Sequence, residues 1–90
     1  MSEPQNNTTR ARIMTLIERI LERPAGAAPL DTGATMNALG LSSMKMISLM
    51  LAIEVEFNLT IPQSDITPAN FESIASVEST VERLISSEAG

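Results

Sequence analysis

Residues 39–57 read LGLSSMKMISLMLAIEVEF, a short polar turn that leads directly into a nearly all-apolar segment. Gly40 supplies a flexible turn, and the serine pair stands where hydroxyl side chains cap the first turn of a helix. Free N–H groups and the positive end of the helix dipole favour a phosphate at such a terminus. The stretch predicts a helix from Ser43 to about Phe57, capped by Ser42, with a serine hydroxyl at an anion-binding end.

The predicted helix carries more apolar residues than one buried face requires. One stripe at three-and-four spacing is assigned to the core: Met46, Leu49, Met50, Ile53 and Phe57. The second stripe is offset by roughly 60–100° at about 100° per residue, and consists of Met44, Ile47, Leu51 and Val55. These four residues either pack beneath a loop or form an exposed apolar strip on which a partner protein docks.

The segment before this helix contains a first helix and a long loop. Thr8 or Thr9 caps the first helix and Pro24 stops it. Its apolar face is Ile13, Leu16, Ile17, Ile20 and Leu21. Residues 24–42 read as a long ordered loop in which Leu30, Met36 and Leu39 point inward.

The segment after the central helix contains two further helices. Asn58 closes the central helix, and Leu59 and Ile61 pack inward from an extended loop. Thr67 and Pro68 predict a short helix that ends near Phe71. Ser73 caps a last helix with Ile74, Val77, Val81, Leu84 and Ile85 on one face.

The predicted fold class is all-α: a small bundle of three main helices and one short helix, with a long loop between the first two main helices. No alternating strand pattern or internal repeat is present in the sequence. The domain is predicted to cover residues 9–86, with flexible tails at residues 1–8 and 87–90.

Composition excludes several classes of function. The 90 residues include no histidine and no cysteine, so the chain lacks the commonest metal ligand and cannot build a cysteine-ligated metal site. The sequence predicts a non-catalytic protein without a metal site. Glu54 and Glu56 lie on different faces of a helix and cannot readily act together as a two-carboxylate site. No signal sequence or membrane-spanning run is evident, so we expect a cytoplasmic protein.

The charge distribution gives a further expectation about partners. The net charge is −5, and after Lys45 the chain has a single cation, Arg83, against seven acids. This acidic second half argues against nucleic acid and favours a basic protein partner.

The residues around Ser43 resemble the acyl and peptidyl carrier protein superfamily. The resemblance covers roughly residues 13–85 and rests on Leu39-Gly40, the serine pair, Met44, the apolar helix to Phe57, Ile61-Pro62 and Phe71-Glu72-Ser73-Ile74. It implies that a phosphopantetheinyl transferase, using coenzyme A and Mg²⁺, attaches 4′-phosphopantetheine to Ser43. The thiol of that arm would then hold an acyl or aminoacyl group as a thioester.

Three positions depart from the fatty-acid carriers. Ser42, Ser48 and Val55 stand where those carriers usually have acidic residues. The sequence looks more like a stand-alone aminoacyl carrier protein, which implies loading by an ATP-dependent amino acid:carrier protein ligase similar to the core of a class II aminoacyl-tRNA synthetase. A downstream enzyme would accept the cargo, and we expect a monomer. The expected partner-binding residues are Met44, Ile47, Ser48, Leu51, Glu54 and Val55.

Two alternatives remain open at this point. One is a fatty-acyl, polyketide, peptidyl or D-alanyl carrier, because the ligase and not the carrier selects the cargo. The other is a small helical adaptor that binds a partner through the Met44, Ile47, Leu51 and Val55 strip without any modification.

Overall fold

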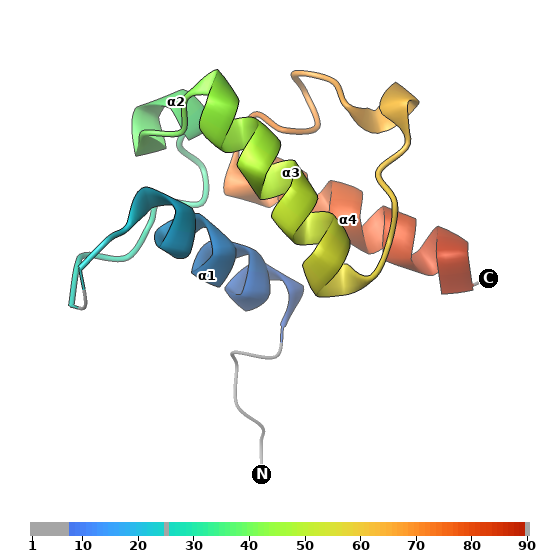
Figure 1. The fold of residues 1–90 in the computed structure, drawn as a ribbon, viewed down its shortest axis with the longest axis horizontal. Coiled ribbons are helices and arrows are strands. Elements are labelled where there is room, and N and C mark those ends of the chain that lie inside the picture. The colour runs from blue at the N-terminus through green and yellow to red at the C-terminus, as the bar shows by residue number, and fades with distance from the viewer. Residues whose placement is uncertain (1–7, 25, 90) are drawn as a thin grey trace, which may run out of the picture.

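The computed structural model describes residues 8–24 and 26–89, and these form a helical bundle (Figure 1). The helices are α1 (Thr9–Leu21), α2 (Met36–Leu39), α3 (Ser43–Phe57) and α4 (Ile74–Ala89), with a 3-10 helix, η2 (Gln63–Asp65). The described ranges contain no strand, only an isolated bridge between Thr35 and Ser73. The predicted all-α fold class is confirmed.

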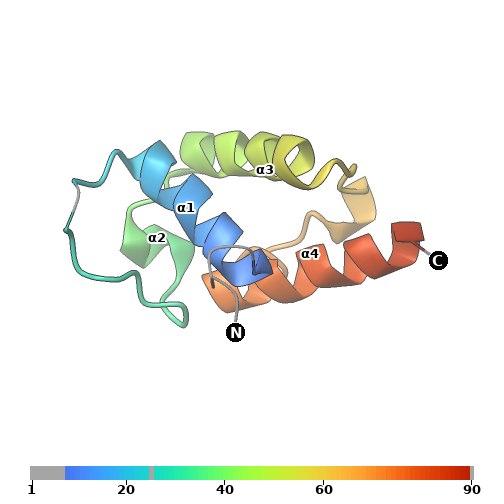
Figure 2. The ribbon, with the colours of Figure 1, turned by 90° about the horizontal axis from the view of Figure 1, so that it is seen from below.

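The core lies where the three long helices meet. Helix α1 packs against both α3 and α4, and Figure 2 shows α3 and α4 on opposite sides of the molecule with α1 between them. The predicted inward faces supply the most deeply buried side chains: Ile13, Ile17, Leu49, Ile53, Ile74, Val77 and Val81. Leu30, Met36, Leu59 and Ile61 are buried from the connecting segments, as predicted. Ile85, predicted to face inward, is instead 37% exposed near the end of α4.

The predicted caps form at the starts of α1 and α3 and at the end of α3, and α1 ends at a cap that was not predicted. The Thr8 hydroxyl accepts a hydrogen bond from the Ala11 N–H at 3.0 Å, and the Ser42 hydroxyl accepts one from the Lys45 N–H at 3.4 Å. Helix α1 ends before Pro24, because Glu22 adopts the left-handed conformation with φ 56°. Asn58 closes α3 in the same way with φ 53°.

The predicted position of the short helix was wrong. Residues 68–71 form turns, although the Thr67 hydroxyl does accept the Asn70 N–H at 3.2 Å as a cap would. The short helix is α2, which lies inside the segment predicted to be a loop throughout. Its start is fixed by tertiary contact, because the Met36 N–H donates to the Glu72 carbonyl at 2.8 Å.

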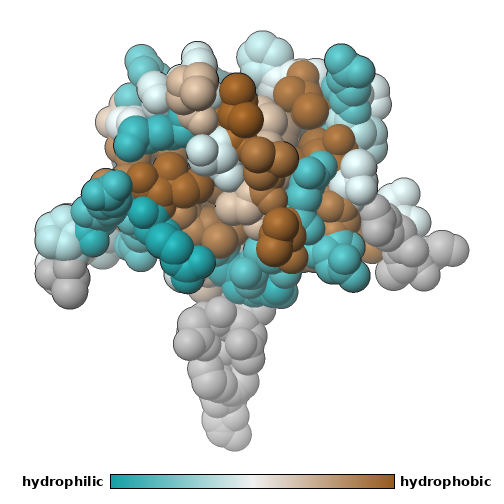
Figure 3. All heavy atoms as spheres, in the orientation of Figure 1, coloured by the Kyte–Doolittle hydropathy of each residue, from teal (hydrophilic) through white to brown (hydrophobic). Residues whose placement is uncertain are grey.

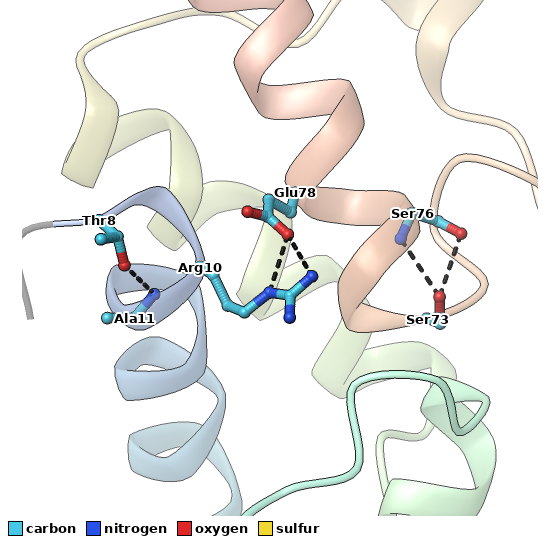
Figure 4. Close-up of polar contacts among 6 residues, drawn as sticks. All are labelled: Thr8, Arg10, Ala11, Ser73, Ser76 and Glu78. Atoms are coloured by element: carbon cyan, nitrogen blue, oxygen red, sulfur yellow. Dashed lines mark hydrogen bonds and ion pairs between the residues drawn. The ribbon is translucent and has the colours of Figure 1, made fainter. Parts of the chain in front are cut away.

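One further bond fastens this part of the chain to α4, and a cap and an ion pair hold α4 itself. The Ala75 N–H donates to the Thr32 carbonyl at 3.1 Å, and the Ser73 hydroxyl accepts the Ser76 N–H at 3.2 Å, which caps α4 as predicted (Figure 4). The Arg10 guanidinium also pairs with Glu78 at 2.8 Å and joins α1 to α4 (Figure 4). The segment that precedes the serine pair is therefore held on the bundle at the start of α4.

The structure describes more of the C-terminal end of the chain than of the N-terminal end. Apart from Thr8, the predicted N-terminal tail at residues 1–8 lies outside the described residues. Helix α4 continues to Ala89, three residues beyond the predicted domain end at residue 86. Among the described residues, no helix combines the length and apolar character that a membrane span requires.

Candidate functional site

The turn between α2 and α3 positions the serine pair. Gly40 ends α2 with φ 104°, and its N–H donates to the Asn37 carbonyl at 3.0 Å. The Leu41 N–H donates to the Met36 carbonyl at 3.0 Å, and both of these side chains are buried. This pattern is a Schellman motif with its hydrophobic contact. A Cβ on Gly40 would have room, so the positive φ is what requires glycine here.

The two serines occupy different positions in the helix terminus. Both are exposed. Ser42 is the cap, since its hydroxyl accepts the Lys45 N–H and its carbonyl accepts the Met46 N–H at 2.8 Å. Ser43 is the first residue of α3, and its hydroxyl forms no hydrogen bond within the described part of the chain. The Ser43 hydroxyl is therefore the more accessible of the two to a modifying enzyme.

The surroundings of Ser43 fit a phosphodiester. As first-turn residues, Ser43 and Met44 have backbone N–H groups without intrahelical acceptors. The helix dipole stabilises a negative charge at this end by about 0.3–1 kcal/mol at an exposed site. Lys45 adds a positive side chain in the same turn. These donors and charges match the chemistry of a 4′-phosphopantetheine phosphate.

The second apolar stripe of α3 is exposed. The exposed fractions are 74% for Met44, 53% for Ile47, 59% for Leu51 and 83% for Val55. Figure 3 shows a run of hydrophobic surface over α3. Ser48 is exposed on the same side of the helix. The four residues therefore do not pack beneath a loop, and they form the exposed apolar strip that was the other expectation.

Glu54 has a role in the fold that the sequence analysis missed. It is half-buried, and its Oε2 accepts the Ile61 N–H at 2.8 Å, while its carbonyl accepts the Leu59 N–H at 3.1 Å. These bonds fasten the segment after α3 to the end of the helix. Glu54 therefore has a role in the fold, and its place on the partner-binding surface stays a prediction.

Glu56 is likewise held by an internal contact. Its Oε2 lies 2.8 Å from Arg12 Nε, and its carbonyl accepts a second bond from the same guanidinium at 2.9 Å. The Arg12 guanidinium also lies 4.3 Å from the centre of the Phe57 ring. In residues 8–24 and 26–89, no cluster of three or more His, Cys, Asp or Glu residues could hold a metal ion.

Comparison with known proteins agrees with this geometry. Residues 11–84 match the family model described as "Phosphopantetheine attachment site". Aminoacyl carrier protein 1 of Bradyrhizobium diazoefficiens is 48% identical over 73 residues, which is 81% of each chain. Aminoacyl carrier protein 2 of the same organism is 35% identical over 79 residues, covering 88% of this chain and 89% of the relative.

Solved structures give the same result. A chain in the crystal structure of Bradyrhizobium japonicum glycine:[carrier protein] ligase complexed with glycylated carrier protein is 48% identical, with a TM-score of 0.65, and the match covers 79% of this chain and 96% of that one. In the complex of that ligase with cognate carrier protein and a glycyl adenylate analogue, the identity is 47%, the TM-score 0.68 and the coverage 82% and 96%. The chain belongs to the family of phosphopantetheine-binding carrier proteins.

Proposed function

We propose that this protein is an aminoacyl carrier whose 4′-phosphopantetheine is attached to the Ser43 hydroxyl. The observation that carries the proposal is the exposed Ser43 hydroxyl without a hydrogen bond, at the first residue of α3 and at one end of an exposed apolar strip. Its similarity to two aminoacyl carrier proteins, over most of its length, supports the aminoacyl class of cargo.

Attachment requires little of the carrier itself. A phosphopantetheinyl transferase joins Ser43 Oγ to the pantetheine phosphorus of coenzyme A, and adenosine 3′,5′-bisphosphate leaves. The hydroxyl proton passes to a base of the transferase, which agrees with a chain that has no histidine. Ser42 holds the first turn of α3 in place, and the free N–H groups of that turn stabilise the phosphate.

The attached group supplies a terminal thiol that holds an aminoacyl group as a thioester. An ATP-dependent amino acid:carrier protein ligase delivers that group, and a downstream enzyme accepts it. Because both coenzyme A and ATP are consumed in these steps, we place the protein in the cytoplasm. The carrier contributes position and recognition, and the enzymes contribute the chemistry.

The ligase is proposed to dock on Met44, Ile47, Ser48, Leu51 and Val55 of α3. This surface begins beside Ser43, so a ligase bound there holds the attachment site next to its own active site. The absence of acidic residues at Ser42, Ser48 and Val55 makes the surface apolar where a fatty-acid carrier presents charge. An apolar recognition pocket on the ligase fits it better than a purely basic one.

A loading assay tests the proposal. The holo protein is incubated with ATP, glycine and the Bradyrhizobium japonicum glycine:[carrier protein] ligase, and its intact mass is measured. We expect the mass of one glycyl group to be added and then removed by hydroxylamine, which cleaves thioesters. A holo protein that takes up no amino acid from a panel of all twenty would contradict the aminoacyl role. Failure to accept a phosphopantetheinyl group at all would instead favour the unmodified adaptor.

A further inference from the structure

The charges beside the exposed strip differ in sign from the protein as a whole. The net charge of −5 and the acidic second half predicted a basic partner. In the structure, Glu72 is exposed just before α4 and Glu82 along it, and α4 lies on the side of the molecule away from α3 (Figure 2). These two acidic side chains therefore do not set the charge beside the strip on α3.

The helix periodicity places a row of cations along one edge of the strip. Lys45 and Glu56 are eleven residues apart, which puts them about 20° apart around α3 at about 100° per residue. Since Glu56 pairs with Arg12 at 2.8 Å, this side of α3 faces α1. Arg12 and Arg19 are seven residues apart on α1 and lie about 20° apart by the same rule. Lys45 and Arg19 thus lie on the facing sides of α3 and α1, with Lys45 about 16 Å from Glu56 along the axis of α3 at 1.5 Å per residue.

A pocket opens between α1 and α3 at this edge. Its volume is about 240 Å³, and it is lined by Arg12, Thr15, Leu16, Arg19 and Glu56. Hydrophilic side chains lie beside the hydrophobic run in the space-filling view (Figure 3). Within the described ranges, the three ion pairs involve Arg10, Arg12 and Arg83, and neither Arg19 nor Lys45 takes part in one.

The pocket therefore carries a net positive charge. Glu56 neutralises Arg12, whose guanidinium is also held over the Phe57 ring. Arg19 is exposed and contributes a charge with no carboxylate partner among the described residues. A planar guanidinium in this state binds a carboxylate through two parallel hydrogen bonds.

We infer that an aspartate or glutamate side chain of the loading ligase enters this pocket and binds Arg19, while Lys45, outside the pocket lining, adds positive charge at the start of α3. The inference deepens the proposed function and rests on it. The apolar strip supplies contact area, and the cationic edge fixes the orientation of the ligase across α3. A positive edge on a protein of net charge −5 also steers the strip toward an acidic rim on the ligase and away from wrong orientations.

The test compares two variants that have the same net charge. Arg19→Ala removes one positive charge from the pocket, and Ser79→Glu adds one negative charge at an exposed position of α4. Both are prepared as holo proteins and loaded with glycine by the Bradyrhizobium japonicum ligase at several salt concentrations. We expect Arg19→Ala to raise the KM for carrier about three- to fivefold at low salt, as losing an exposed charge pair does. The KM of Ser79→Glu should stay within about twofold of the parent protein, because this charge lies away from the docking surface.

The salt series separates a lost ion pair from a structural effect. The KM of the parent protein should rise with salt, and that of Arg19→Ala should rise less steeply. Arg19→Lys should bind the ligase more tightly than Arg19→Ala and less tightly than the parent protein, because lysine restores the positive charge without the planar guanidinium group. Equal KM values for Arg19→Ala and Ser79→Glu would overturn the inference, and a lower KM for Arg19→Ala would show that the ligase presents a basic surface. If the ligase loads the holo parent protein with no amino acid at all, that result contradicts the aminoacyl role and not the position of the acidic side chain.

Discussion

Removing a side chain from the centre of the exposed strip should weaken loading without weakening the fold. Full burial of a leucine side chain contributes about 1.5–3 kcal/mol. In the isolated protein 59% of Leu51 is still exposed, so covering it with a ligase gains about 0.9–1.8 kcal/mol. The change Leu51→Ala should therefore raise the KM for carrier by about 4- to 20-fold, with the upper figure as a limit because alanine retains its Cβ.

The assay pairs this variant with a partly buried position on another helix. Ile85 of α4 is 37% exposed, so Ile85→Ala should lower the free energy of unfolding by about 1–2 kcal/mol. It should leave the KM for carrier unchanged. The free energy of unfolding of Leu51→Ala should instead stay within about 0.5 kcal/mol of that of the parent protein, as is usual for substitutions at exposed positions. If both variants are loaded with the parent KM, the ligase docks elsewhere and the strip has no role in loading.

Four further changes test the helix ends and one loop contact. Glu22→Gly should raise the free energy of unfolding by up to about 1 kcal/mol in urea denaturation, because glycine accepts the φ of 56° without strain; Asn58→Gly should gain less, since asparagine already tolerates φ 53°. Glu54→Gln should lower the free energy of unfolding by about 0.5–1.5 kcal/mol, because a charged acceptor of the Ile61 N–H becomes a neutral one. An unchanged midpoint of urea denaturation would show that this bond does not hold the loop. Ser42→Ala should lose about 1 kcal/mol of helix capping and still accept phosphopantetheine, and a loss of modification here would move the attachment site from Ser43 to Ser42.

Much of the fold could be predicted because the three long helices have strong local signals. Their apolar faces repeat at helical spacing, and hydroxyl residues cap their starts. The same periodicity separated the buried stripe of α3 from the exposed one. Burial of Leu49 and Ile53 beside the exposed Leu51 and Val55 follows from their positions around a single helix.

The short elements depended on tertiary contacts that have no local signal. Helix α2 is only four residues long, too short for a periodic pattern. Thr35 and Gly40 cap its two ends, and the bond from Met36 to Glu72 and the bridge from Thr35 to Ser73 hold it in place. Thr67 has the sequence signature of a cap but is followed by turns rather than a helix.

The role of Glu54 was hidden for a related reason. A glutamate near the end of an amphipathic helix normally faces solvent, and nothing local indicates that the chain will return to it. Its acceptor role became visible only with the backbone of Ile61 in place at 2.8 Å. The cationic edge at Arg19 and Lys45 likewise depends on how α1 packs against α3, which the overall charge of the sequence does not reveal.

The central claim, that Ser43 carries the phosphopantetheine, is tested most directly by intact mass. The parent protein, Ser42→Ala and Ser43→Ala are each incubated with coenzyme A, Mg²⁺ and a promiscuous phosphopantetheinyl transferase. We predict that the parent protein and Ser42→Ala gain the mass of one phosphopantetheinyl group and that Ser43→Ala gains none. Modification of Ser43→Ala, or an unchanged mass for all three proteins, would contradict the claim.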